Sequence, residues 1–220
     1  SKDRKLIIKT IPDLEKQMLV SILERYVNHF KEHPNTLISK IYGIYTFENQ
    51  DLDLKFNLIL IKNICGFSKN YIERAYDLKG SSYDREVLKT GVVNSKEELK
   101  IRVLKDKDFE KFETKLYIQQ EIAEGLRRQI EIDSLFFRKV KLIDYSLMIF
   151  YINKKKYWEE NGKDAQDHTA KNPLASIPSE KEEGIYYNIG IIDYLQPYNF
   201  EKKLEKYFKK FQRLDINLDT

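Results

Sequence analysis

The chain contains a single cysteine, Cys65, so it cannot form an internal disulfide. A lone thiol is typical of a reducing compartment, and we expect a cytoplasmic protein. No apolar run approaches the roughly 20 residues needed to span a bilayer, and the first residues carry no secretory signal pattern. These absences predict a protein that is soluble or peripheral at the cytosolic face of membranes.

Several patterns that carry chemistry are also missing. The histidines His29, His33 and His168 are scattered, so we predict surface residues and no metal-binding set. There is no Gly-x-x-x-x-Gly-Lys loop and no His-Arg-Asp or Asp-Phe-Gly triplet, so neither a P-loop enzyme nor an ordinary protein kinase is indicated. The net charge of +4 is too small to indicate a nucleic-acid partner.

The chain has ample material for a core, because 41% of its 220 residues are hydrophobic and it contains 15 Tyr and 12 Phe. This length suits one large domain or two small lobes. Basic residues gather at 154–156 and again between 202 and 210. Each run is either an ordinary solvated face or a contact with an anionic membrane, where each basic residue is worth about 1 kcal/mol.

Apolar spacing in the first part of the chain predicts a small α+β unit. Residues 5–10, 39–47, 55–61 and 72–78 are expected strands, the middle two forming an antiparallel pair. Between the first two strands, a helix is indicated by apolar residues at every fourth position, namely Leu14, Met18, Ile22, Tyr26 and Phe30.

The second part predicts longer elements. Residues 112–140 are expected to be helical, and residues 142–152 to form a strand buried on both faces. Residues 157–184 are polar and rich in turn signals, so a flexible insert is expected there. A short strand at 189–192 follows, and Asn199 looks like the N-cap of an amphipathic helix.

Charged residues occur at four positions where apolar strands end or are interrupted: Lys9, Asp77 with Lys79, Asp144 and Asp193. A carboxylate in such a place is costly unless it is paired, hydrogen-bonded or holding a cation. The ordinary explanations are an exposed lysine and aspartates that cap turns. The alternative is metal-assisted phosphoryl transfer, in which a lysine binds phosphate, one aspartate positions the acceptor hydroxyl and the other holds Mg²⁺.

Five segments carry a resemblance that favours the second explanation. They are Ile-Ile-Lys-Thr at 7–10, PNTLISKIYGIY at 34–45, Asp-Leu-Lys-Gly-Ser at 77–81 with Arg85, Ile-Asp-Tyr-Ser-Leu at 143–147, and Gly-Ile-Ile-Asp at 190–193 with Leu-Gln and Lys-Lys-Leu-Glu after it. In this order they resemble motifs of the phosphatidylinositol phosphate kinase family, and together they span most of the chain.

The resemblance implies an α+β, two-lobed kinase-like fold. An antiparallel N-lobe sheet would occupy about residues 1–85, and a mixed α/β C-lobe about residues 86–220. The cofactors would be ATP and Mg²⁺. Lys9 would bind ATP phosphates with Glu15 as its helix partner, and Ile61, Lys62 and Asn63 would form the hinge beside adenine. Lys79 would contact the transferring phosphate, Asp144 would be the catalytic aspartate and Asp193 would bind Mg²⁺. Arg85 would bind the substrate.

Two parts of the family pattern have no match here, the glycine-rich loop upstream of Lys9 and the activation segment beyond Thr220. The hinge also reads Ile61-Lys62-Asn63, where the family commonly has a paired asparagine. We therefore expect an incomplete catalytic domain with weak or no activity for these residues alone.

The leading functional hypothesis is a kinase that converts phosphatidylinositol 4-phosphate to phosphatidylinositol 4,5-bisphosphate. The stretch Leu-Gln-Pro-Tyr at 195–198 favours it over a 3-phosphate 5-kinase, while a 5-phosphate 4-kinase is the near alternative. An alternative of another class is a pseudokinase that binds lipid with little catalysis. The expected partners are ATP, a phosphoinositide head group, an anionic membrane surface and, from the family resemblance, a second copy of the chain.

Overall fold

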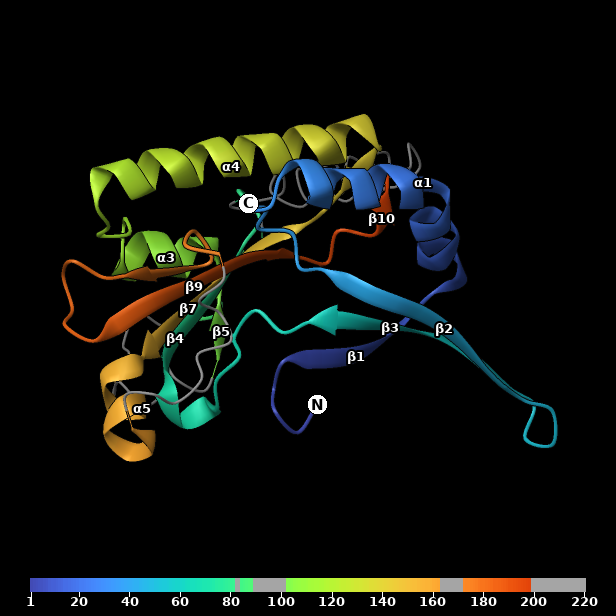
Figure 1. The fold of residues 1–220 in the computed structure, drawn as a ribbon, viewed down its shortest axis with the longest axis horizontal. Coiled ribbons are helices and arrows are strands. Elements are labelled where there is room, and N and C mark those ends of the chain that lie inside the picture. The colour runs from blue at the N-terminus through green and yellow to red at the C-terminus, as the bar shows by residue number, and fades with distance from the viewer. Residues whose placement is uncertain (82–83, 89–101, 163–171, 199–220) are drawn as a thin grey trace, which may run out of the picture.

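The computed structural model describes residues 1–81, 84–88, 102–162 and 172–198 (Figure 1). An antiparallel three-stranded sheet has the order β1-β3-β2. Its strands are β1 (Leu6–Ile11), β2 (Ile41–Asn49) and β3 (Leu54–Lys62). The hairpin of β2 and β3 projects away from the rest of the fold (Figure 1).

A second sheet has five strands in the order β5-β4-β7-β9-β8, and it is mixed because β5 runs parallel to β4. Its strands are β4 (Ile72–Leu78), β5 (Val103–Leu104), β7 (Ser146–Asn153), β8 (Ser176–Pro178) and β9 (Ile185–Ile192). The expected α+β class with an antiparallel sheet in the N-terminal part is confirmed, and the division into two lobes stays a prediction.

The position of β4 differs from the prediction. The sequence grouped this strand with the N-terminal unit, up to about residue 85, but β4 pairs with β7 in the second sheet. The chain changes sheets earlier, between the end of β3 and the short 3₁₀ turn η1 (Lys69–Tyr71). Apolar alternation identifies a strand but carries no information about its partner.

The helices are α1 (Asp13–Glu32), α3 (Asp106–Phe112), α4 (Gln120–Lys139) and α5 (Lys154–Asn161). The helix expected at 112–140 begins only at Gln120, because residues 113–119 are not helical and Thr114 has a φ of 62°. On α1 the buried face is formed by Leu19, Ile22, Tyr26 and His29, while Leu14, expected in the core, is 55% exposed.

Two further expectations are corrected by the structure. The strand expected at 142–152 is interrupted at Asp144, whose φ is 64°, leaving a two-residue β6 (Leu142–Ile143) before β7. The insert expected at 157–184 contains the last turns of α5 and the strand β8, so it is not irregular throughout. The helix expected after Asn199 and the second basic run lie outside the described residues.

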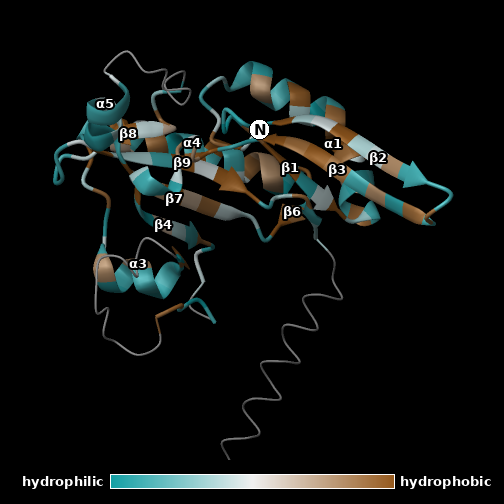
Figure 2. Ribbon diagram, turned by 90° about the horizontal axis from the view of Figure 1, so that it is seen from below, coloured by the Kyte–Doolittle hydropathy of each residue, from teal (hydrophilic) through white to brown (hydrophobic). Residues whose placement is uncertain are grey.

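The two long helices lie side by side on one face of the molecule (Figure 1). Figure 2 shows hydrophobic residues along the strands of both sheets, whereas the short helix α5 is largely hydrophilic. The main core cluster draws buried side chains from both sheets and both long helices, among them Ile22, Ile59, Phe137, Ile149 and Ile189. The two sheets and these helices thus share one apolar interior.

A buried carboxylate ties α4 to α1. Asp133 of α4 is fully buried and accepts hydrogen bonds from Thr36 Oγ1 at 2.7 Å, the Leu37 amide at 2.8 Å and Gln129 Nε2 at 3.0 Å. Its Oδ1 also lies 2.7 Å from Nε2 of His29, which is 6% exposed. The prediction of a surface position is therefore wrong for His29, while His168 lies outside the described residues.

We predict that Asp133→Asn lowers the free energy of unfolding by at least about 2 kcal/mol, because it sets an amide N–H₂ among groups that donate to a buried carboxylate. Urea unfolding of the purified protein measures the change. Glu131→Gln, on the exposed face of the same helix, is the matched control and should stay within about 0.5 kcal/mol of wild type. Equal stabilities for the two variants would contradict the structural role of Asp133.

Candidate active site

Strand pairing brings three charged residues to one edge of the second sheet. Leu78, the last residue of β4, faces Leu147 near the start of β7, and Ser146 of β7 faces Ile192 at the end of β9. Because both pairings are antiparallel, the residues just outside these strand ends must be neighbours. Those residues are Lys79, Asp144 and Asp193.

Both aspartates lie in sharply turned backbone. Asp144 and Asp193 have φ values of 64° and 56°, a left-handed conformation that aspartate tolerates better than most residues. The turns are held by the short pairing of β6 with β10 (Gln196–Pro197). Next to Asp193, the buried hydroxyl of Tyr194 donates to the Ser39 carbonyl at 2.6 Å. The backbone that carries both carboxylates is therefore held in place.

A cavity of about 320 Å³ lies between the two sheets. Eight of the nine residues to which the sequence assigned a site role line it, namely Lys9, Glu15, Ile61, Lys62, Asn63, Lys79, Asp144 and Asp193. The rest of its wall is mainly apolar and includes Ile7, Ile41, Ile59, Met148 and Ile192. The cavity thus combines an apolar wall with a charged edge.

Two ion pairs cross the charged edge. Lys9 Nζ lies 2.5 Å from Asp193 Oδ1, and Lys79 Nζ lies 3.3 Å from Asp144 Oδ1 and 3.0 Å from its carbonyl oxygen. The first pair joins the two sheets, because Lys9 belongs to β1. The side chains of Lys9 and Asp193 are 48% and 46% exposed, so the pair adds little to stability and its charges remain accessible.

The expected pairing of Lys9 with Glu15 differs from the observed one. Among the described residues, the ion pair of Lys9 is with Asp193, and Glu15 forms none although it lines the same cavity from the first turn of α1. The family resemblance placed Glu15 beside Lys9 at the site, but it did not predict that Asp193 is the carboxylate that pairs with the Lys9 ammonium.

The expected hinge lines the cavity and lies where the chain leaves the first sheet. The Lys62 and Asn63 amides donate to the carbonyls of Lys40 and Lys5, both at 2.8 Å. These two N–H groups are thus already bonded within the protein. Burial lowers the pKa of the Lys62 ammonium below its ordinary value.

Arg85 is absent from the residues that line the cavity, and its role in substrate binding stays a prediction. Its side chain is 11% exposed and forms ion pairs with Asp77 at 2.8 Å and Asp106 at 2.7 Å. The sequence interpretation missed Asp106, because the amides that it binds, those of Lys79 and Gly80, lie 27 and 26 residues earlier in the chain.

In the basic run at 154–156, one lysine is buried and the other two are about half exposed and lie near acidic side chains. Lys154 is buried and donates to Ser176 Oγ at 2.9 Å, while Lys155 and Lys156 lie 3.1 Å and 3.9 Å from the carboxylates of Glu183 and Glu160. Within the described residues, no group of three or more His, Cys, Asp and Glu side chains is arranged to hold a metal ion. No described helix is long and apolar enough to cross a membrane.

Comparison with known proteins matches this chain to a family. The family model described as Phosphatidylinositol-4-phosphate 5-Kinase matches residues 1–176 and 153–218. The chain belongs to the phosphatidylinositol phosphate kinase family. The family resemblance expected from the sequence motifs is thereby confirmed.

Similar proteins include phosphatidylinositol phosphate kinases of two kinds. The chain is 33% identical over 149 residues to phosphatidylinositol 4-phosphate 5-kinase 9 of Arabidopsis thaliana, covering 68% of this chain and 17% of the relative. It is 26% identical over 243 residues to the mouse phosphatidylinositol 4-phosphate 5-kinase type-1 beta, covering 94% and 44%. It is 36% identical over 154 residues to the zebrafish phosphatidylinositol 5-phosphate 4-kinase type-2 gamma, covering 68% and 34%. The chain spans less than half the length of each of these relatives.

In this phosphatidylinositol phosphate kinase domain, Gly190 packs closely against Ile64, a residue of the cavity wall. A Cβ atom at this position would lie 2.5 Å from Cδ1 of Ile64, which lines the cavity. We predict that Gly190→Ala displaces Ile64 at a cost of about 1–3 kcal/mol and weakens ATP binding several-fold. Isothermal titration with ATP measures the affinity.

Gly125→Ala is the control for this prediction. It adds the same methyl group in the middle of α4, where the nearest atom, Leu174 Cδ2, is 3.5 Å away. That substitution should leave ATP affinity unchanged and raise stability by about 0.5–1 kcal/mol. Unchanged ATP affinity in Gly190→Ala would show that this cavity does not bind the nucleotide.

Proposed function

We propose that this chain carries the catalytic site of a lipid kinase that transfers the γ-phosphate of ATP to phosphatidylinositol 4-phosphate, giving phosphatidylinositol 4,5-bisphosphate. One observation carries the proposal. Lys9, Lys79, Asp144 and Asp193, from four separate segments of the chain, converge on one cavity. The arrangement supplies two cations for phosphate oxygens and two carboxylates for the acceptor and a metal ion.

The nucleotide would lie between the two sheets, as in a two-lobed kinase. The apolar wall formed by Ile7, Ile41 and Ile59 suits an adenine ring, because a flat apolar base gains free energy when it leaves water. The hinge residues 61–63 would border the base. The triphosphate would then extend toward Lys9 and Lys79 at the charged edge.

The residues present fit one Mg²⁺ ion. Mg²⁺ is typically held by one or two carboxylates together with substrate phosphates and water, so a cage made only of protein groups is unnecessary. Asp193 offers a half-exposed carboxylate at the cavity, and we assign it this role. When bound, the ion would neutralise charge on the phosphates. Lys9, released from Asp193, would then bind phosphate oxygens.

The chemical step needs a base and an oriented acceptor. An inositol hydroxyl oxygen forms a bond to the γ-phosphorus, the bond from that phosphorus to the β–γ bridging oxygen breaks, and ADP leaves. The Asp144 carboxylate takes the hydroxyl proton as this happens. Lys79 lies against Asp144 and supplies positive charge next to the transferring phosphoryl group. Together these groups orient the acceptor and stabilise the transition state.

The acceptor lipid defines the second candidate function. The zebrafish relative, at 36% identity, is a phosphatidylinositol 5-phosphate 4-kinase. Transfer of the phosphoryl group to the 4-hydroxyl of phosphatidylinositol 5-phosphate is therefore the second candidate reaction. Either reaction takes its substrate from an anionic membrane surface, and we propose peripheral attachment at the cytosolic face. We also propose that the chain pairs with a second copy of itself.

We predict that the full-length protein, given radiolabelled ATP and vesicles containing one monophosphorylated inositide at a time, forms most product from phosphatidylinositol 4-phosphate. Positional analysis of the product identifies the hydroxyl that was phosphorylated. Preference for phosphatidylinositol 5-phosphate would favour the 4-kinase. Preference for phosphatidylinositol 3-phosphate would indicate the other 5-kinase class, and binding without turnover would indicate a pseudokinase.

We predict that Asp193→Asn lowers kcat by at least about a hundredfold, because the amide loses the charge that holds the metal ion. Asp53→Asn is the matched control, since Asp53 also has a positive φ, 46°, but lies in the exposed turn between β2 and β3. That control should retain wild-type turnover. Near-normal kcat in Asp193→Asn would remove Asp193 from the mechanism.

A further inference from the structure

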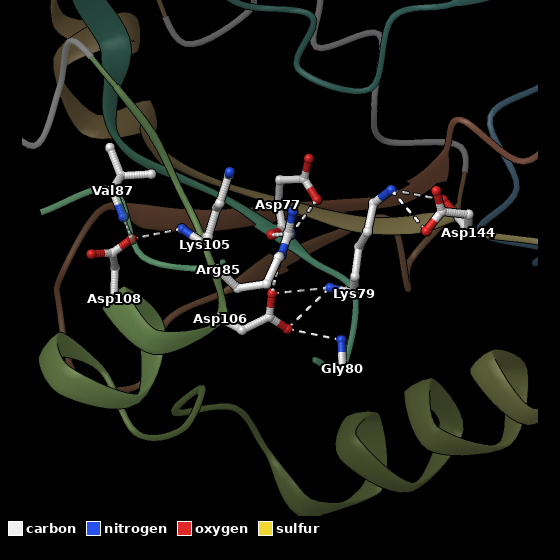
Figure 3. A network of polar contacts seen from close by, with 9 residues as sticks. All are labelled: Asp77, Lys79, Gly80, Arg85, Val87, Lys105, Asp106, Asp108 and Asp144. Carbon is white, nitrogen blue, oxygen red and sulfur yellow. Dashed lines mark hydrogen bonds and ion pairs between the residues drawn. The ribbon is translucent and has the colours of Figure 1, made fainter. Parts of the chain in front are cut away.

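Asp106 binds the backbone at the point where Lys79 leaves its strand. One carboxylate oxygen, Oδ1, accepts from the Lys79 amide at 3.0 Å and from the Gly80 amide at 2.8 Å, and Oδ2 lies 3.3 Å from the Lys79 amide. Gly80 has a φ of 64°, so the chain turns sharply directly after Lys79. Asp106 comes from the first turn of α3, a different part of the chain (Figure 3).

Arg85 extends this contact to the other side of Leu78. Its Nε donates to Asp106 Oδ2 at 2.7 Å, and its Nη2 donates to both Oδ1 of Asp77, at 2.8 Å, and the Asp77 carbonyl oxygen. The side chains of Arg85 and Asp106 are each only 11% exposed. Together, Arg85 and Asp106 form hydrogen bonds with backbone groups of residues 77, 79 and 80, so the end of β4 is fixed on both sides of Leu78.

A neighbouring carboxylate on the same helix turn acts elsewhere. Asp108 is fully buried and accepts from the amides of Val87, Leu88 and Lys105 at 2.9 to 3.1 Å. It therefore anchors the chain at 87–88 and the start of α3, away from Lys79. Asp106 and Asp108 both accept hydrogen bonds from backbone amides, but of these two carboxylates only Asp106 binds the backbone that carries Lys79.

Figure 3 shows Lys79 extending from this fixed backbone to Asp144. We propose that Asp106 is a positioning residue, which sets the direction of the Lys79 side chain and thereby the placement of its ammonium at the phosphoryl-transfer site. Asp106 does not line the cavity, but it binds the backbone amide of Lys79, which does. The inference rests on the proposed function, in which Lys79 binds the transferring phosphoryl group.

The charge state of Asp106 agrees with this role. Burial raises its pKa, but the hydrogen bonds from Arg85 and the Gly80 amide, with the charge of Arg85, outweigh burial and lower the pKa overall. The carboxylate therefore stays ionised across the neutral pH range and keeps its strong hydrogen bonds to the two amides.

A double-mutant cycle on the full-length protein tests the inference. The variants are Asp106→Asn, Lys79→Met and the double variant, assayed with ATP and vesicles containing phosphatidylinositol 4-phosphate or phosphatidylinositol 5-phosphate. Asp106→Asn should lower kcat by about 10- to 100-fold, the range for residues that orient a group at a reacting centre, and change the KM for ATP by less than about threefold. In the Lys79→Met background it should change kcat by less than about threefold, because residues acting through one group are not additive.

Asp108→Asn is the control for a general loss of structure. Its effect on kcat, whatever its size, should multiply with that of Lys79→Met, while thermal unfolding shows a loss of stability like that of Asp106→Asn. If Asp106→Asn does not fold, Arg85→Lys replaces it, because this change loosens Asp106 without removing its bonds to the two amides. Its effect should likewise vanish in the Lys79→Met background.

Two outcomes overturn the inference alone: wild-type kcat in Asp106→Asn, or effects of the Asp106 and Lys79 variants that multiply. A wild-type protein that forms product excludes failure of the proposed function as the reason for either result. A wild-type protein that forms no product from any inositide overturns the proposed function, and the inference with it.

Discussion

The pairing of β7 with its neighbours β4 and β9 is the constraint on which the site depends. Both pairings are antiparallel, and their register sets the ends of three strands at one edge of the sheet. Lys79, Asp144 and Asp193 meet there although 114 residue positions separate the first from the last. A shift of one residue in β7 would turn its buried side chains toward the opposite face, so the apolar core that fixes this register also fixes the charged cluster.

The ion pairs at this edge of the sheet are open to solvent. The Lys9–Asp193 pair is half exposed, and the Asp144 side chain beside Lys79 is likewise half exposed. Exposed pairs of this kind contribute little to stability, so exchanging one partner for a phosphate oxygen or a metal ion costs little free energy. By contrast, the pairs that fix the backbone around the site are largely buried, as Arg85 and Asp106 are. Accessible charges therefore stand on a rigid frame, an arrangement suited to binding an ionic ligand in one orientation.

The buried carboxylate of Asp133 connects the helices to this frame. It holds Thr36 and the Leu37 amide, and the segment that follows binds β9 through the Leu37 carbonyl, which accepts from the Ile191 amide at 2.7 Å. In return the Ser39 amide donates to the Ile191 carbonyl at 2.9 Å. Ile191 lies two residues before Asp193. One series of hydrogen bonds therefore connects the packing of α1 against α4 with the position of Asp193. This shared support explains how a site between two sheets keeps its geometry.

The sequence by itself determined where the long strands and the two long helices lie, the family, and which charged residues share the cavity, because apolar periodicity and short motifs are local properties of the chain. It did not reveal that β4 joins the second sheet, that His29 is buried against Asp133, or that Arg85 pairs with Asp106 instead of lining the cavity. Nor did it distinguish Asp193 from Glu15 as the partner of Lys9. These features were decided only by the tertiary structure, because each depends on which distant segments pack together, and a side chain meets such a partner only after the sheets have paired.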